Sequence, residues 1–267
     1  MDKITSLEQL CRGINSVKSH KRGFLTNFYL DTSKHQHWID TKIISAISIG
    51  DTFFIIKENP TFWNVYYNTF DVDTLQEDLK LFCKKYNNKK IIFDVIGKQN
   101  NIDKVSPCFL NNGLTALKRL VRLSKVAENS NYSDSNFEYA STNDIQELQQ
   151  LLGSNFNLYV EQLPDNYELE ILIENKGILV LRKDKKIYAF VIFEKTSTTL
   201  YLRYWFVSPD YRGQGIGSKL LRIMFKQGEH CKRFIHWCLD DNNNALIKYL
   251  HYGYKEDGLV DQIYSNI

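Results

Sequence analysis

The most constraining feature of this chain is a glycine-rich turn between an apolar strand-like run and an amphipathic segment. Residues 207–218 read Val-Ser-Pro-Asp-Tyr-Arg-Gly-Gln-Gly-Ile-Gly-Ser. Pro209 stops the preceding β-ladder because proline has no N–H to donate, and the apolar residues after Gly215 recur with helical spacing. A strand, turn and helix in this order directs several backbone N–H groups and the positive end of a helix dipole toward one small volume. We therefore expect residues 212–218 to bind a phosphate or a pyrophosphate.

Two common phosphate-binding motifs do not fit this turn. A Walker A loop requires Gly-x-x-x-x-Gly-Lys-[Ser/Thr], whereas Gly213 is followed five positions later by Ser218. A dinucleotide-binding fingerprint requires Gly-x-Gly-x-x-Gly after a first strand, whereas the glycines here alternate and lie late in the chain. The turn therefore belongs to a different class of phosphate site.

Two segments resemble the GNAT superfamily of N-acetyltransferases. Residues 212–217, Arg-x-x-Gly-x-Gly, resemble the acyl-CoA signature of that superfamily. Residues 242–254, Asn-x-x-Ala-x-x-x-Tyr-x-x-x-Gly-Tyr, resemble its following helix and strand. The resemblance covers residues 137–267 as one domain, and the two motifs occur in the family's order with a strand between them.

The resemblance implies a binding site for acetyl-CoA and no metal. The backbone N–H groups of the turn would hold the pyrophosphate of CoA, with the Arg212 guanidinium adding positive charge. The residues of this cradle are Arg212, Gly213, Gln214, Gly215, Ile216, Gly217 and Ser218. Phe206 and Val207 would bind the pantetheine arm, on a strand that separates from the next strand, 234–239, to open a V-shaped slot. Asn242 would help to fix the cofactor arm.

The resemblance also implies a general acid, and it leaves the general base open. Tyr249 matches the family tyrosine that protonates the departing CoA thiolate, and a phenol with an ordinary pKa of ~10 can donate that proton. Many members of the family carry a carboxylate on the strand before the turn. In this chain that strand, 200–207, has only arginine and tyrosine as polar side chains near its centre. The other candidate bases are Glu194, His236 and Asp240, and a water relay is the alternative to all three.

The order of predicted elements indicates an α/β fold divided by a polar linker, residues 127–136. The prediction is two domains, 1–128 and 136–267, each with a mixed, mostly antiparallel sheet flanked by helices. The expected strands are 52–56, 62–70, 90–96, 177–181, 187–193, 200–207 and 234–239, and the expected helices are 74–86, 105–111, 143–152, 165–174, 215–228 and 242–252.

An offset of 140 residues aligns several elements of the two halves, which indicates an internal duplication. Gly113 then corresponds to Gly253, and residues 75–86 correspond to residues 215–226. At the same offset the glycine turn corresponds to residues 72–77, Val-Asp-Thr-Leu-Gln-Glu, which contain no glycine and two acids. Tyr249 corresponds to Phe109, which keeps the ring and lacks the acidic proton. The first half is therefore predicted to be a degenerate GNAT-like domain without a CoA loop.

Composition limits the kinds of binding partner and the cellular compartment that we expect for this protein. The 267 residues carry 34 Lys and Arg against 31 Asp and Glu, a formal net charge of +3, which predicts no nucleic-acid partner. The five scattered cysteines, together with the absence of a signal peptide or an apolar run long enough for a membrane span, favour the cytoplasm and no membrane partner. His35 and His37 lack a third ligand at a telling spacing, so they are expected to be solvated loop residues and not a metal site.

The predicted function is transfer of an acetyl group from acetyl-CoA to a primary amine of a small molecule or peptide, by a monomer or a homodimer. The first alternative is a non-catalytic sensor or interaction module that binds acyl-CoA. The second is a tandem transferase that uses aminoacyl-tRNA, although such proteins generally lack the glycine loop present here.

Overall fold

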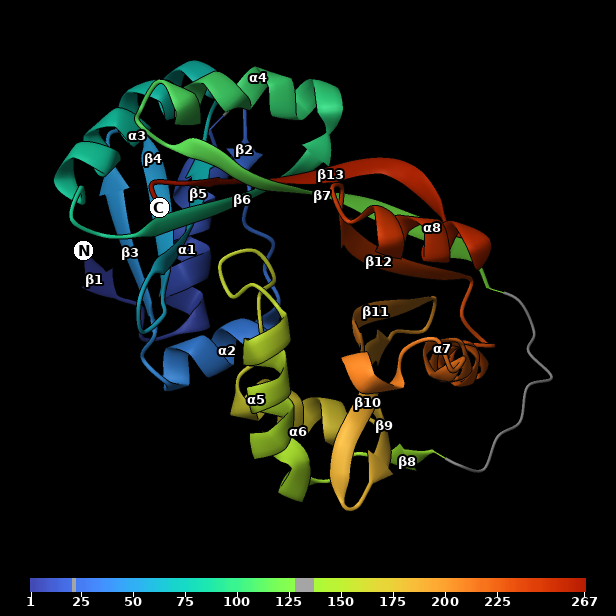
Figure 1. Ribbon diagram of the computed structural model, residues 1–267. Coiled ribbons are helices and arrows are strands. Elements are labelled where there is room, and N and C mark those ends of the chain that lie inside the picture. The colour runs from blue at the N-terminus through green and yellow to red at the C-terminus, as the bar shows by residue number, and fades with distance from the viewer. Residues whose placement is uncertain (21–22, 128–136) are drawn as a thin grey trace. The chain divides into compact units, whose positions relative to one another are not determined.

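The computed structural model describes residues 1–20, 23–127 and 137–267, which form two compact units. The first unit comprises residues 1–120 and 258–267, and the second comprises residues 121–257. The chain leaves the first unit along β7 (Thr115–Val126) and returns to it along β13 (Lys255–Ser265), as Figure 1 shows. The predicted linker, 127–136, lies outside the described residues apart from Ala127.

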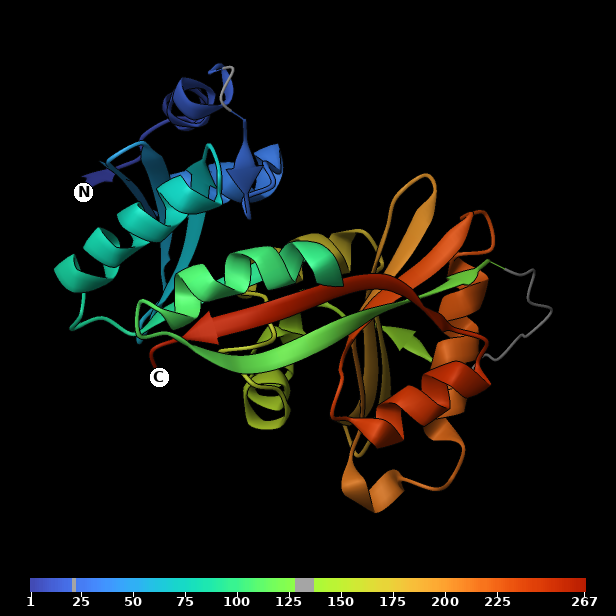
Figure 2. The same ribbon diagram turned by 90° about the horizontal axis from the view of Figure 1, so that it is seen from above.

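The first unit is a mostly antiparallel sheet with helices on both faces (Figures 1 and 2). Its strands run in the order β1 (Asp2–Lys3), β3 (Ile44–Ile49), β4 (Thr52–Glu58), β5 (Trp63–Thr69), β6 (Ile91–Lys98), β13 and β7, with β2 (Leu25–Thr26) paired to β5. Its helices are α1 (Leu7–Lys18), α2 (Thr32–Asp40), α3 (Val72–Lys85) and α4 (Gln99–Leu110). On β4, Phe53 and Ile55 pack with residues of α1 and α2, while Phe54 packs against Phe82 of α3. Alternate side chains of this strand are therefore buried on opposite faces of the sheet.

The second unit has the same kind of architecture. Its strands run in the order β7, β12 (Arg233–Leu239), β11 (Thr199–Val207), β10 (Lys186–Lys195), β9 (Ile178–Lys183) and β8 (Glu138–Tyr139). The helical elements are η1 (Thr142–Asp144), α5 (Ile145–Asn155), α6 (Asn166–Glu174), η2 (Pro209–Tyr211), α7 (Ile216–Gln227) and α8 (Asn243–His251). Helices α5 and α6 share a core with Phe190 and Phe206, and α7 packs against β10 and β11. The predicted fold class, a mixed sheet flanked by helices in each half, is confirmed.

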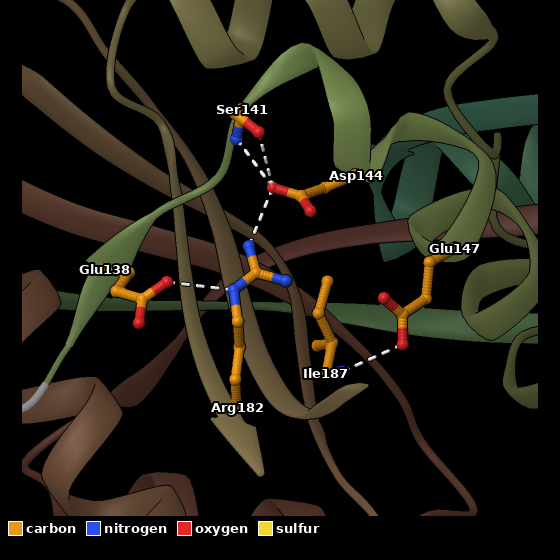
Figure 3. A network of polar contacts seen from close by, with 6 residues as sticks. All are labelled: Glu138, Ser141, Asp144, Glu147, Arg182 and Ile187. Carbon is orange, nitrogen blue, oxygen red and sulfur yellow. Dashed lines mark hydrogen bonds and ion pairs between the residues drawn. The ribbon is translucent and has the colours of Figure 1, made fainter. Parts of the chain in front are cut away.

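A polar network holds the start of the second unit to its sheet (Figure 3). Arg182 of β9 donates from Nε to Glu138 Oε2 (2.9 Å) and from Nη2 to Asp144 Oδ2 (2.7 Å). The same carboxylate accepts from the backbone N–H (2.7 Å) and the hydroxyl (3.0 Å) of Ser141, which makes a capping box at η1. Burial alone would raise the pKa of Asp144, but these hydrogen bonds and the Arg182 charge lower it below its ordinary value. The carboxylate of Glu147 on α5 accepts a further hydrogen bond, from the backbone N–H of Ile187 on β10 (2.8 Å).

The two halves share the element order strand, strand, strand, helix, strand, helix, strand. The strands β7 and β13 begin 140 residues apart, at Thr115 and Lys255, the offset that the sequence comparison predicts. In both halves the parallel pair at the centre is short, Trp63–Asn64 with Ile91–Ile92 in the first and Thr199–Leu202 with Arg233–His236 in the second. The compact units are nevertheless divided differently from the predicted domains, because residues 258–267 complete the sheet of the first unit through β6. The division into related domains 1–128 and 136–267 remains a proposal.

Two local predictions for the first half are wrong. Helix α4 begins at Gln99 and not at residue 105. Its first turn is polar, no side chain caps it and Pro107 lies inside it, so the usual start signals are missing. His35 and His37 lie in helix α2 and not in a loop. His35 is buried, its Nδ1 accepts from the backbone N–H of Asp31 (2.9 Å), and burial lowers its pKa to about 4.

Three further observations concern the described residues as a whole. No helix among them is both long enough and apolar enough to cross a membrane. Within residues 1–20, 23–127 and 137–267, no group of three or more His, Cys, Asp or Glu side chains could hold a metal ion. The cysteines are free thiols, and Cys108 and Cys238 are the buried ones.

Candidate active site

The candidate site of the second unit begins where β11 separates from β12. The two strands pair in parallel over Thr199–Leu202. Beyond this point β11 continues to pair with β10 as far as Val207. A bulge at the point of separation leaves Arg203 without an opposing residue, because Leu202 faces Phe193 and Tyr204 faces Ile192. The edge of β11 toward β12 is therefore unpaired from Arg203 onward, which agrees with the expected separation of the strands.

The glycine turn follows the unpaired strand directly. Ser208 closes the strand by donating from its N–H to the carbonyl of Tyr188 (2.8 Å), and η2 leads into the turn. Gly213 and Gly215 have φ values of +77° and +76°, and Gly215 is the N-cap of α7. A Cβ atom at either glycine would meet no heavy atom within 4 Å. Backbone conformation and not crowding therefore requires glycine at these two positions.

The backbone N–H groups of this turn are available to a ligand. The first bond of helix α7 runs from Lys219 N–H to Gly215 carbonyl (3.0 Å). Among the residues that the structure describes, the N–H groups from Gly213 to Ser218 find no hydrogen-bond acceptor. The cap residue is a glycine, so no side chain satisfies the N–H groups that begin every helix. Six successive donors and the positive end of a helix thus lie together at the end of β11, an arrangement that suits an anion.

Gly217 has a role that the sequence does not reveal. Its φ is not positive, unlike those of Gly213 and Gly215. A Cβ atom at Gly217 would lie 2.6 Å from Cζ2 of Trp205, so glycine is required by the close packing of helix α7 on β11. The indole Nε1 of Trp205 is buried and has no partner among the described residues. No role for Trp205 can be predicted from the sequence, because an aromatic residue on a strand is indistinguishable there from a core residue.

The remaining predicted cofactor residues already make contacts within the protein. Arg212 donates from Nε to the carbonyl of Val207 (3.0 Å), so its guanidinium lies at the end of β11. The side chain of Gln214 donates to the carbonyl of Asp210 (3.4 Å). Phe206 directs its ring into the core beneath α5 and α6, which leaves only its backbone for a ligand. Asn242 caps α8 by accepting from the N–H of Ala245 (3.2 Å), a structural role beside the predicted cofactor contact.

Tyr249 lies in an aromatic cluster that covers the gap between the two strands. It is 6% exposed, and its ring centroid lies 3.7 Å from that of His236 on β12 and 5.5 Å from that of Trp205 on β11. Burial is the largest of the effects that raise the pKa of Tyr249 well above its ordinary value. The tyrosine therefore keeps its proton at neutral pH. Tyr254 lies 5.8 Å away in the same cluster, and its hydroxyl is buried without a partner among the described residues.

The three candidate bases are not brought together. Glu194 forms an ion pair with Arg203 (2.7 Å), which neutralises its charge. His236 is buried, and burial lowers its pKa to about 3, so its imidazole is neutral. Its Nε2 has no partner among the described residues, but the ring lies against Tyr249 inside the cluster. Asp240 follows the end of β12 in a turn. None of the three therefore stands out as a proton acceptor.

Comparison with known proteins identifies the type of domain. Residues 145–254 match the acetyltransferase (GNAT) family. A 72-residue segment is 33% identical to thialysine N-epsilon-acetyltransferase from Sus scrofa, covering 26% of this chain and 42% of that protein, so the chain spans less than half of the relative. Residues 145–254 are therefore similar to an acetyltransferase (GNAT) domain.

Solved structures support the fold over more of the chain. An acetyltransferase of the GNAT family from Colwellia psychrerythraea is 16% identical, with a TM-score of 0.57, and covers 99% of this chain and 98% of its own. A GCN5-related N-acetyltransferase from Kribbella flavida is 10% identical, with a TM-score of 0.56 over 87% of this chain and 93% of its own. A tandem GNAT protein from the clavulanic acid biosynthesis pathway is 7% identical, with a TM-score of 0.53 over 81% of this chain and 78% of its own. These three similarities concern the fold of most of the chain.

Proposed function

We propose that the second unit transfers an acetyl group from acetyl-CoA to a primary amine. The observation that carries this proposal is the run of six unbonded backbone N–H groups from Gly213 to Ser218, located at the end of a strand that has separated from its neighbour. The match of residues 145–254 to an acetyltransferase family supports acyl transfer as the type of reaction.

The turn would hold the pyrophosphate of acetyl-CoA. Hydrogen bonds from backbone N–H groups to a charged oxygen are stronger than neutral ones, about 1.5–3 kcal/mol each. Arg212 adds a guanidinium at the same end of the strand, already oriented by its bond to Val207. Because the donors are held by the fold, binding costs little reorganisation.

The unpaired edge of β11 would bind the rest of the cofactor and the reacting carbonyl. Backbone groups from Arg203 to Val207 have no strand partner on the β12 side. They would pair with the pantetheine arm, and a backbone N–H directed at the thioester oxygen would stabilise the negative charge that develops there. Attack by the neutral amine forms the N–C bond, and the C–S bond then breaks.

Tyr249 would supply the proton for the departing sulfur. Its ring lies in the aromatic cluster at the gap, and its hydroxyl keeps its proton at neutral pH. The same burial that raises the pKa of the phenol also raises the pKa of a thiol placed beside it, so the transfer does not become unfavourable through desolvation alone.

Release of CoA in the presence of a panel of amines tests this function. The panel comprises thialysine, lysine, spermidine, glucosamine and a peptide with a free N-terminus, with acetylated product identified by mass spectrometry. We expect acetylation of at least one amine, and we expect Tyr249→Phe to lower kcat by about 10²–10⁴-fold with unchanged affinity for acetyl-CoA. Tyr254→Phe is the matched control, because it removes a neighbouring buried hydroxyl and should leave kcat unchanged.

The same experiment separates the two alternatives. Binding of acetyl-CoA with no acetylation of any amine would support a non-catalytic acyl-CoA sensor. Full activity of Tyr249→Phe would be consistent with acetyl transfer but would reject Tyr249 as the general acid.

A further inference from the structure

Glu161 lies in a tightly closed loop between α5 and α6. Its Oε2 accepts from the backbone N–H of Asn157 (2.8 Å), and its own N–H donates to the carbonyl of Asn157 (2.8 Å). The side chain of Asn157 also accepts from the N–H of Tyr159 (2.9 Å). These reciprocal bonds fix the direction of the Glu161 carboxylate and leave its second oxygen for another partner.

The residue after Glu161 anchors this loop to the point where β11 leaves β12. The carbonyl of Gln162 accepts from the hydroxyl of Tyr204 (2.8 Å) and from Nη2 of Arg203 (3.2 Å). Arg203 is the bulged residue at the separation, and its guanidinium is held on the other side by Glu194. The backbone of Glu161 is thus positioned beside the unpaired part of β11.

The carboxylate acts on groups from all three elements that border the gap. Burial is the main cause of a raised pKa at Tyr204 on β11, at Cys238 on β12 (to about 12) and at Tyr249 on α8. In each case the negative charge of Glu161 raises the pKa further. A single carboxylate therefore lies within electrostatic range of both diverging strands and of the proposed general acid.

Glu161 has no counter-ion among the described residues. It is partly buried, and no Lys, Arg or His of the described chain pairs with it. The other acids near the sheet differ, because Glu194 pairs with Arg203 and Asp144 pairs with Arg182. Burying a carboxylate without a cation is costly, and a cationic ligand would offset that cost.

We propose that Glu161 binds the ammonium group of the acceptor and removes its proton before attack. This inference rests on the proposed acetyl transfer and assigns the general base that the sequence leaves open. The Glu161 carboxylate takes one proton from R–NH₃⁺, which frees the nitrogen lone pair to attack the thioester carbon. Tyr249 gives its proton to the departing CoA sulfur and recovers one from the nitrogen as the amide forms. Glu161 later releases its proton to solvent.

The pH dependence of kcat/KM separates this role from a structural one. Burial raises the pKa of Glu161 above its ordinary value, although the Asn157 N–H opposes the shift. Five neighbouring groups with shifted pKa values do not titrate between pH 5 and 8. Arg203 stays charged, His236 stays neutral, and the buried Cys238, Tyr204 and Tyr249 stay protonated. The kcat/KM of the wild type should therefore rise with pH through one ionisation above the ordinary glutamate range, the ionisation of Glu161.

Three variants test the proposal with acetyl-CoA and the panel amine that the wild type acetylates fastest. Glu161→Gln keeps an acceptor for the Asn157 N–H and loses the base, so kcat/KM should fall about 10²–10⁴-fold and lose the acidic limb, with unchanged affinity for acetyl-CoA. Glu161→Asp should retain the acidic limb at a lower rate. Glu170→Gln, an exposed acid on α6, is the matched control and should behave as the wild type.

The outcomes distinguish a failure of the Glu161 assignment from a failure of the proposed acetyl transfer. Wild-type kcat/KM and an unchanged pH profile in Glu161→Gln would overturn the assignment of Glu161 and leave the transferase standing. If the wild type acetylates no amine of the panel, the proposed function fails and this inference fails with it. If Glu161→Gln does not bind acetyl-CoA, the pH profile of Glu161→Asp decides, because Asp and Glu have different ordinary pKa values. A shifted midpoint of the acidic limb supports Glu161 as the base, and an unshifted midpoint overturns the assignment.

Discussion

Replacing Gly215 by alanine tests whether the turn acts through its backbone. Gly215 has a φ of +76°, and a Cβ atom there would meet no heavy atom within 4 Å. The expected cost is therefore conformational and not steric, about 1–2 kcal/mol for an L-residue held in the left-handed region. If the turn relaxes to relieve that cost, the adjacent N–H groups rotate away from the anion.

The magnitude of the binding loss follows from the donors involved. A hydrogen bond to a charged oxygen contributes about 1.5–3 kcal/mol, so the loss of one donor should weaken acetyl-CoA binding by at least about tenfold. Isothermal titration calorimetry measures that affinity, and denaturant titration measures the free energy of unfolding. We expect Gly215→Ala to lower both.

Gly113 is a matched control for the backbone strain. It has a φ of +79° and equally open surroundings, but it follows α4 in the first unit. Gly113→Ala should lose a similar free energy of unfolding and keep the wild-type affinity for acetyl-CoA. Equal affinities of the two variants would refute the assignment of the turn as the cofactor site.

Three further predictions concern stability. Gly217→Ala should lower the free energy of unfolding by about 1–3 kcal/mol, because its Cβ would lie 2.6 Å from the Trp205 ring, and Trp205→Phe in the double variant should restore part of the loss in urea titrations. Asp144→Asn should lower the free energy of unfolding by about 1–3 kcal/mol at pH 7. The hydrogen bonds from Ser141 and the contact with Arg182 outweigh burial and lower the folded pKa of Asp144. The difference from the wild type is therefore present above about pH 4 and disappears as the pH falls through the folded pKa. Asp261→Asn should raise the free energy of unfolding at pH 7 by on the order of 1 kcal/mol. Burial and a neighbouring carboxylate raise the folded pKa of Asp261, so the wild type becomes more stable as the pH falls through that pKa. The stability difference between the variant and the wild type should therefore vanish near pH 4.

The second half could be predicted well from sequence because its signals are local. The strand before the turn, Pro209 and the glycines mark the boundaries of β11 and α7 without reference to the rest of the chain. The expected helix 215–228 differs from α7 by one residue at each end. By contrast, α4 begins without a side-chain cap, and its interior proline resembles a helix end. Its first six residues therefore could not be assigned from local pattern.

Structural features that depend on contacts between residues far apart in the chain could not be predicted from the sequence. The pairing of β13 with β6 joins residues far apart in the chain, and no periodicity specifies which sheet a final strand completes. Glu161 lies in a loop with no motif, and its place beside the gap depends on the bonds of Gln162 to β11. Trp205 is required to explain Gly217, but its neighbours are known only once α7 packs on the sheet.

We propose above that the backbone N–H groups of residues 213–218 bind acetyl-CoA, and an NMR titration tests this most directly. The chain has 13 glycines, of which three lie in this turn. In protein labelled with ¹⁵N only at glycine, addition of acetyl-CoA should shift the amide resonances of Gly213, Gly215 and Gly217 to saturation and leave that of Gly113 in place. Saturable binding with these three resonances unmoved would contradict the claim.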